Sequence, residues 1–135
     1  AYGLSVCDIL KISDNEIQWF SGKEDYTEGI HMLQQTYQIP FILLSMGRDG
    51  SRAYYKDMLV EVPAFLQKNT IETTGAGDTF GACCLHHILK YGLDNLTKQQ
   101  LKEMLTFANA AASIITTRKG ALRVMPSLEE IQRLL

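Results

Sequence analysis

A run of apolar residues, Phe41 to Leu44, most constrains how this chain can fold. Pro40 and Gly47 stand on either side of the run, and a helix does not fit between two such breakers. A strand with one face in water alternates apolar and polar residues, and this run does not alternate. We therefore predict a central strand that is covered on both faces, which places the chain in the α/β class.

The residues before this strand predict another strand and two helices. Val6 to Ile12 has the composition of a short, buried strand. Ser13 and Glu16 have the spacing of a capping box, so a helix should begin there and end near Gly22, with Trp19 in the core. A second helix is indicated by apolar residues at helical spacing: Tyr26, Ile30, Leu33 and Tyr37. Together these elements predict a strand-helix-helix-strand unit with a right-handed crossover.

A hairpin should follow the central strand. Asp49-Gly50 is a tight-turn signal. Lys56-Asp57 separates two strand-like segments, 51–55 and 59–62. We therefore predict an antiparallel meander at one edge of the sheet.

The rest of the chain predicts mainly helices. One helix should end at Gly92, and a second carries an apolar stripe over 101–115 with small residues that permit close packing. A third should begin at Ser127, because Glu130 again completes the spacing of a capping box. Four apolar side chains of this last helix are expected to point inward: Leu128, Ile131, Leu134 and Leu135.

Composition and charge exclude several classes of partner. The net charge is −2 and no run of Lys or Arg forms a basic stripe, so we expect no nucleic-acid partner. No apolar stretch approaches the ~20 residues that span a bilayer, and no signal pattern is present, so we expect no membrane contact and a cytoplasmic protein. The three cysteines show neither a disulfide framework nor metal-ligand spacing.

The segment from Glu72 to Gly81 carries the strongest chemical signal. Gly75, Ala76 and Gly77 lack bulk and stand where a helix should begin, so their N–H groups could bind an anion at the positive end of the helix dipole. Asp78 beside them could accept a proton from a substrate hydroxyl. The alternative is that Asp78 only caps the helix and the glycines only form the turn.

This segment resembles the C-terminal signature of a known family, the ribokinase and fructokinase type of ATP-dependent carbohydrate kinases, also called phosphofructokinase-B-like. The signature is Asp-Thr-x-Gly-Ala-Gly-Asp-x-Phe, and Glu72 to Phe80 matches it with one departure, Glu72 in place of Asp. The resemblance implies a ribokinase-like three-layer α/β/α sandwich. It also implies that Asp78 is the catalytic base and that the amides of Gly75 to Gly77 form the anion hole.

Further segments extend the resemblance over nearly the whole chain. Lys11 to Glu16 resembles the Asn-x-x-Glu region of the family, which implies that Glu16 helps to organise Mg²⁺. Ser45 to Gly50 resembles the Ser-x-Gly-x-x-Gly turn along the ATP phosphates, which implies that Ser45, Gly47 and Gly50 bind nucleotide.

Two more segments resemble parts of the family's nucleotide site. Phe107 to Ala112 resembles the helix that borders the adenine, with Asn109 facing the nucleotide. Lys119 to Ala121 resembles a loop near the nucleotide and a monovalent cation such as K⁺. Glu72 and Thr74 would belong to that cation site, although the longer side chain of Glu72 alters its geometry.

The resemblance begins at the middle of the family's domain and runs to its end. It implies that residues 1–135 are the C-terminal, ATP-binding and catalytic half, without the N-terminal half that carries the lid and most sugar contacts. We therefore expect an ATP-dependent sugar kinase that prefers fructose, with Mg²⁺ and a homodimer in the full-length form, and weak or absent activity for this segment alone. The alternatives are a kinase of the same family for ribose, 2-keto-3-deoxygluconate, tagatose phosphate or adenosine, a nucleotide-binding module without catalysis, or a regulatory fragment that pairs with a partner.

Overall fold

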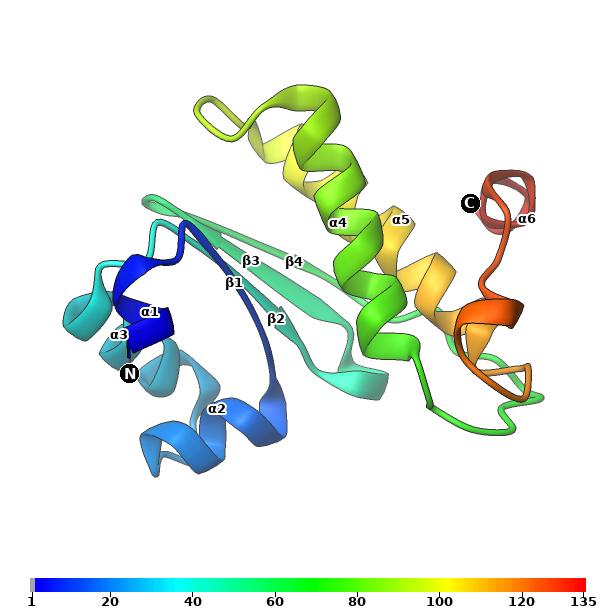
Figure 1. The fold of residues 1–135 in the computed structure, drawn as a ribbon, viewed down its shortest axis with the longest axis horizontal. Coiled ribbons are helices and arrows are strands. Elements are labelled where there is room, and N and C mark those ends of the chain that lie inside the picture. Colours follow the sequence, from blue (N-terminus) through cyan, green and yellow to red (C-terminus); the bar gives the residue numbers. More distant parts are fainter. Residues whose placement is uncertain (1) are drawn as a thin grey trace.

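A four-stranded mixed sheet forms the middle layer of the computed structural model, which describes residues 2–135 (Figure 1). The strands stand in the order β1-β2-β3-β4, with β1 parallel to β2 and the other pairs antiparallel. Their bounds are Ile9–Ser13 for β1, Phe41–Ser45 for β2, Ser51–Tyr55 for β3 and Met58–Val62 for β4. The predicted central strand and the antiparallel meander are both present.

Helices cover both faces of this sheet. The helices α1, α2 and α3 lie on one side, and α4 and α5 on the other (Figure 1). Their bounds are Tyr2–Val6 for α1, Asp14–Ser21 for α2, Tyr26–Tyr37 for α3, Ala76–Tyr91 for α4, Lys98–Ile115 for α5 and Leu128–Leu134 for α6, with short 3₁₀ helices at Gly47–Asp49 and Leu122–Val124. The three-layer α/β/α sandwich is therefore confirmed. Within residues 2–135, no helix is both long and apolar enough to cross a membrane.

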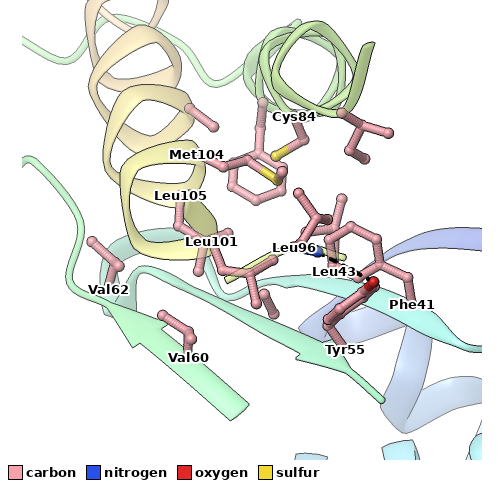
Figure 2. Close-up of a cluster of buried hydrophobic side chains, with 14 residues drawn as sticks. Phe41, Leu43, Tyr55, Val60, Val62, Cys84, Leu96, Leu101, Met104 and Leu105 are labelled. Carbon is pink, nitrogen blue, oxygen red and sulfur yellow. Dashed lines mark hydrogen bonds between the residues drawn. The ribbon is translucent and has the colours of Figure 1, made fainter. Parts of the chain in front are cut away.

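The side chains of β2 alternate between two separate cores. Phe41 and Leu43 belong to the core between the sheet and α4 and α5, which Figure 2 shows with Tyr55, Cys84 and Met104. The neighbouring Ile42 and Leu44 belong to the opposite core, against α2 and α3. All four are fully buried or nearly so, and this is why the run is apolar without alternation.

Local capping signals set several helix boundaries as predicted. Ser13 and Glu16 form the capping box of α2, and the helix ends at Gly22, whose φ is 66°. Ser127 and Glu130 form the same box at α6. A third box, which the sequence analysis did not find, joins Thr97 to Gln100 at α5.

Three predictions about individual side chains are wrong. Val6 ends helix α1 and is not part of a strand, since β1 begins only at Ile9. Trp19 is 85% exposed, because α2 turns Ile17 toward the core and Trp19 away from it. Leu128 and Leu135 are also exposed, so α6 buries mainly Ile131.

One end of the sheet gathers the segments that carry the predicted chemistry. Ser13 at the end of β1 pairs with Ser45 at the end of β2, which pairs with Ser51, which in turn pairs with Val62. The loop after Val62 leads from this end to the N-terminus of α4. Ligands of open α/β sheets bind beyond the carboxyl ends of the parallel strands, so the fold places a binding site here.

The turn after β2 is pressed against the end of β4 at Gly50. Its φ of 99° and ψ of −139° belong to a region that only glycine adopts readily. A Cβ atom there would overlap the carbonyl oxygen of Val62 and would lie 2.8 Å from Cα of Pro63. The turn therefore needs glycine both for its conformation and for this close approach.

We predict that Gly50→Ala lowers the free energy of unfolding by about 3 kcal/mol or more, because strain and backbone overlap add. Gly47→Ala is the matched control in the same turn. Its φ is 53° and no atom lies within 4 Å of the added Cβ, so the loss should be about 1 kcal/mol. Urea unfolding followed by circular dichroism measures both values, and equal losses would contradict the role of Gly50.

Candidate active site

The N-terminus of α4 places the predicted catalytic residues on one helical turn. Gly75 is the N-cap, with a φ of 78°, and Asp78 is the third residue of the helix. Asp78 therefore does not cap α4, contrary to the alternative interpretation. Its side chain is exposed at the N-terminal, positive end of the helix dipole.

The backbone amides of this turn differ in their availability. The N–H of Ala76 donates to the carbonyl oxygen of Thr73 at 3.1 Å. Within residues 2–135, the N–H groups of Gly77 and Asp78 have no such backbone acceptor. The geometry thus leaves Gly77 and Asp78 as the free donors of the helix, whereas the predicted donor Ala76 is already engaged.

A cavity of about 470 Å³ opens between the turn after β2, the loop after β4 and the start of α4. Pockets for nucleotide-sized ligands have volumes of roughly 300–1,000 Å³. Six of the predicted site residues line it: Ser45, Gly47, Gly50, Ala76, Gly77 and Asn109. The structure therefore brings three predicted segments together around one cavity.

Asn109 lines this cavity, but its amide group also serves the fold. Its Nδ2 donates to the carbonyl oxygens of Val62 at 3.2 Å and Pro63 at 3.1 Å. Both donor hydrogens of the amide are then used, and the side chain holds the end of β4 to α5. Only its oxygen is left to face a ligand.

Glu16 and Ser13 stand at the end of β1, outside the lining of the cavity. The Glu16 carboxylate accepts hydrogen bonds from the Ser13 backbone N–H and from the Ser13 hydroxyl, each at 2.8 Å. These two hydrogen bonds, with a smaller contribution from the charge of Lys11, lower the pKa of Glu16 below its usual value. Glu16 is therefore a fixed anion at the same end of the sheet as the cavity.

Glu72 joins the loop before α4 to the loop after α5. Its Oε1 accepts a hydrogen bond from the Gly120 N–H at 2.7 Å. Next to it, a Cβ on Gly75 would lie 3.1 Å from Cβ of Ala121, so the two loops are in contact. A monovalent cation near Glu72 and Thr74 stays a prediction, because the Glu72 side chain is already engaged by this loop.

The model of one protein family, the pfkB family carbohydrate kinase, matches residues 2–128 of the chain. The match covers the sheet, the cavity and the start of α4. The chain belongs to the pfkB family of carbohydrate kinases.

Relatives with known names agree with this membership. Fructokinase-1 of Zea mays is 31% identical over 128 residues, which are 95% of this chain and 39% of that relative. A fructokinase from Vibrio cholerae O395, solved in a fructose, ADP and calcium ion bound form, superposes with a TM-score of 0.87 at 25% identity over 99% of this chain and 42% of the other. Arabidopsis thaliana ribokinase, complexed with ribose and ATP, gives 0.83 at 25% identity over 97% and 41%. The fold is therefore ribokinase-like, and the chain spans about two fifths of the length of these relatives.

Several polar residues that line the cavity of this pfkB-family chain were not predicted from the sequence. Arg48 and Lys68 place two cationic side chains on its lining. Gln67 donates from Nε2 to the Ser113 hydroxyl at 3.2 Å across the same cavity. The segment 63–68 has only the composition of a loop, and its place beside α5 depends on tertiary contacts that no local pattern indicates.

We predict that Glu72→Ala lowers the free energy of unfolding by about 1–3 kcal/mol, because the Gly120 N–H loses a charged acceptor. Glu72→Gln is the matched control, since an amide oxygen of nearly the same reach still accepts the bond. Hydrogen exchange at the Gly120 amide should speed up in the Ala variant and stay slow in the Gln variant. Equal exchange in the Ala variant and the wild type would show that this bond does not hold the two loops together.

Proposed function

We propose that this chain supplies the ATP-binding and catalytic half of a sugar kinase that transfers the γ-phosphoryl group of ATP to a hydroxyl of fructose. The observation that carries the proposal is the placement of Asp78. Its carboxylate is exposed on the first turn of α4, next to unpaired amides. Asp78 is not itself part of the cavity lining, but the two residues before it, Ala76 and Gly77, line the nucleotide-sized cavity.

The volume of the cavity and the charges on its lining suit ATP. Gly47 and Gly50 of the turn after β2 line the cavity, and so do Ala76 and Gly77 of α4. Arg48 and Lys68 add positive charge that suits a polyphosphate. We infer that the phosphates run along the turn after β2 toward the N-terminus of α4, where the free amides bind the terminal phosphate.

Asp78 would then act as the base for phosphoryl transfer. A bond forms between the sugar hydroxyl oxygen and the γ-phosphorus, and the bond from that phosphorus to the β,γ-bridging oxygen breaks. The hydroxyl proton passes to the Asp78 carboxylate, and ADP leaves with the electron pair of the broken bond. The amides of Gly77 and Asp78 would stabilise the charge on the phosphoryl oxygens during the transfer.

The donor set of the chain fits a Mg²⁺ ion that arrives with ATP. Within residues 2–135, no group of three or more His, Cys, Asp or Glu side chains could hold a metal ion by itself. Mg²⁺ usually keeps several waters and binds to substrate phosphates with one or two carboxylates. Glu16 would orient those waters, and bound Mg²⁺ would neutralise phosphate charge.

The choice of fructose rests on the relatives. The relative from Zea mays is a fructokinase, and the one from Vibrio cholerae was solved with fructose and ADP. The remaining three fifths of such a domain would carry the lid and most sugar contacts, and a homodimer and a cytoplasmic location remain proposals for the whole protein.

We predict that Asp78→Asn lowers kcat by about 10²–10⁴-fold, the range of general-base catalysis, and leaves ATP affinity nearly unchanged. Asp57→Asn, in the exposed turn between β3 and β4, is the matched control and should keep full activity. ADP release is measured with the full-length protein and with fructose, ribose or adenosine as the acceptor. The assay gives both kcat and the preferred acceptor. Near-normal turnover of Asp78→Asn would remove Asp78 from the mechanism.

We also predict that Gly47→Val weakens ATP binding more than about tenfold, because a branched side chain enters the phosphate end of the cavity. Gly22→Val is the matched control. Gly22 has a similar φ of 66° and open space around it, but it lies at the end of α2, away from the cavity. Calorimetric titration with ATP compares the two, and equal affinities would contradict the assignment of the turn.

A further inference from the structure

Arg118 lies in the segment that follows α5, and its side chain joins this segment to the last helix, α6. Its Nη1 donates to the carbonyl oxygen of Val124 at 3.0 Å, and its Nη2 forms an ion pair with the Glu130 carboxylate. The side chain is 30% exposed, so solvent and salt screen these interactions only in part. Arg118 therefore fixes both the course of residues 118–124 and their place beside α6.

The helix α6 is a firm support for this arginine. Its Ile131 is 3% exposed and packs against Ala110 and Ala111 of α5. Phe65, which lines the nucleotide-sized cavity, packs against the same cluster. Since α5 also lines the cavity, α6 is anchored on the outside of the cavity wall.

The carboxylate that pairs with Arg118 is itself held in place. Glu130 accepts a hydrogen bond from the Ser127 backbone N–H at 2.8 Å. This bond, followed by the hydrogen bond from Arg118, lowers the pKa of Glu130 below its usual value. The arginine thus meets a charged carboxylate whose position is already set by the helix cap.

The segment after α5 is fixed on its other side to the loop that leads into α4, and Figure 1 shows the two beside each other. The Glu72 N–H donates to the Thr116 carbonyl oxygen at 3.3 Å, and Oε1 of Glu72 accepts the Gly120 N–H at 2.7 Å. Gly75, the N-cap of α4, lies against Ala121. Contacts therefore run without a gap from α6 to the turn that carries the free amides.

We propose that Arg118 is a positioning residue, which holds the first turn of α4 in place through residues 116–124. The proposal rests on the proposed function, because that turn carries Asp78 and the amides assigned there to phosphoryl transfer. Arg118 lies outside the lining of the cavity and acts through Gly120 and Glu72. Without its side chain, residues 118–124 lose their hold on α6, and the turn is placed less precisely against the phosphoryl group.

Amide hydrogen exchange of the unliganded, full-length protein tests this link. Two amides report on it: Gly120, and Thr79, which donates to the Gly75 carbonyl oxygen at 2.9 Å in the first turn of α4. Both should exchange at least about fivefold faster in Arg118→Ala, and Arg118→Lys should recover part of the protection. Arg123→Ala is the matched control. Arg123 is exposed in the same segment and forms no ion pair within residues 2–135, so its variant should exchange like the wild type.

The kinetic constants of the full-length protein separate positioning from a general loss of stability. With ATP and fructose, we expect kcat of Arg118→Ala to fall at least about fivefold while KM for fructose stays within about twofold, because misplaced groups act on the transition state. Rates are compared per folded molecule, with the folded fraction taken from urea unfolding. A merely structural arginine would lower the urea midpoint and leave this kcat unchanged.

The outcomes distinguish this proposal from the proposed function. Unchanged exchange at Thr79 in Arg118→Ala, or equal effects of Arg118→Ala and Arg123→Ala, would overturn the link. Faster exchange with an unchanged kcat would overturn the positioning role, while the proposed function would stand. If the wild-type protein phosphorylates no sugar although the exchange difference is seen, the proposed function is overturned, whereas the exchange data still support the link between α6 and α4.

Discussion

Both faces of β2 must be kept from water, and the arrangement of the helices depends on this requirement. Phe41 and Leu43 point to one side and Ile42 and Leu44 to the other, so a single helical layer could bury only half of the strand. The strand-helix-helix-strand unit supplies one layer before β2, and the pair α4 and α5 supplies the other after β4. Each layer carries its own core, and the polar backbone of the sheet is enclosed between them.

The same arrangement explains where the candidate site lies. Because β1 and β2 are parallel and β4, beyond β3, ends at the same end of the sheet, three connections leave the sheet there. The loop after β4 returns to the sheet as α4, whose N-terminus carries Asp78 and unpaired amides. The positive end of a helix dipole, a tight glycine turn and a cavity thus meet at one end of the sheet.

Local signals predicted much of this structure and tertiary contacts decided the rest. The capping boxes at Ser13 and Ser127 set helix boundaries correctly, because both partners of each box lie within four residues of each other. The exposure of Trp19 could not be foreseen in the same way, since it depends on which face of α2 meets the sheet.

The candidate site shows the same division. The segment Gly75 to Asp78 is visible in the sequence because its residues are adjacent. The partners of Asn109 and Glu72 are not visible, because they are more than forty residues away along the chain. The position of Lys11 beside Gly77 likewise brings together residues that lie more than sixty positions apart in the sequence.

The close contact between Gly50 and the end of β4 also bears on how fast a ligand can bind. The turn is closed by its own hydrogen bonds, with the Met46 N–H donating to the Gly50 carbonyl oxygen at 2.8 Å, and it rests on backbone atoms of the sheet. Its conformational entropy is therefore lost when the chain folds and not when a ligand arrives. A phosphate would meet a surface that already has its bound shape, so association at this turn need not wait for a loop to become ordered.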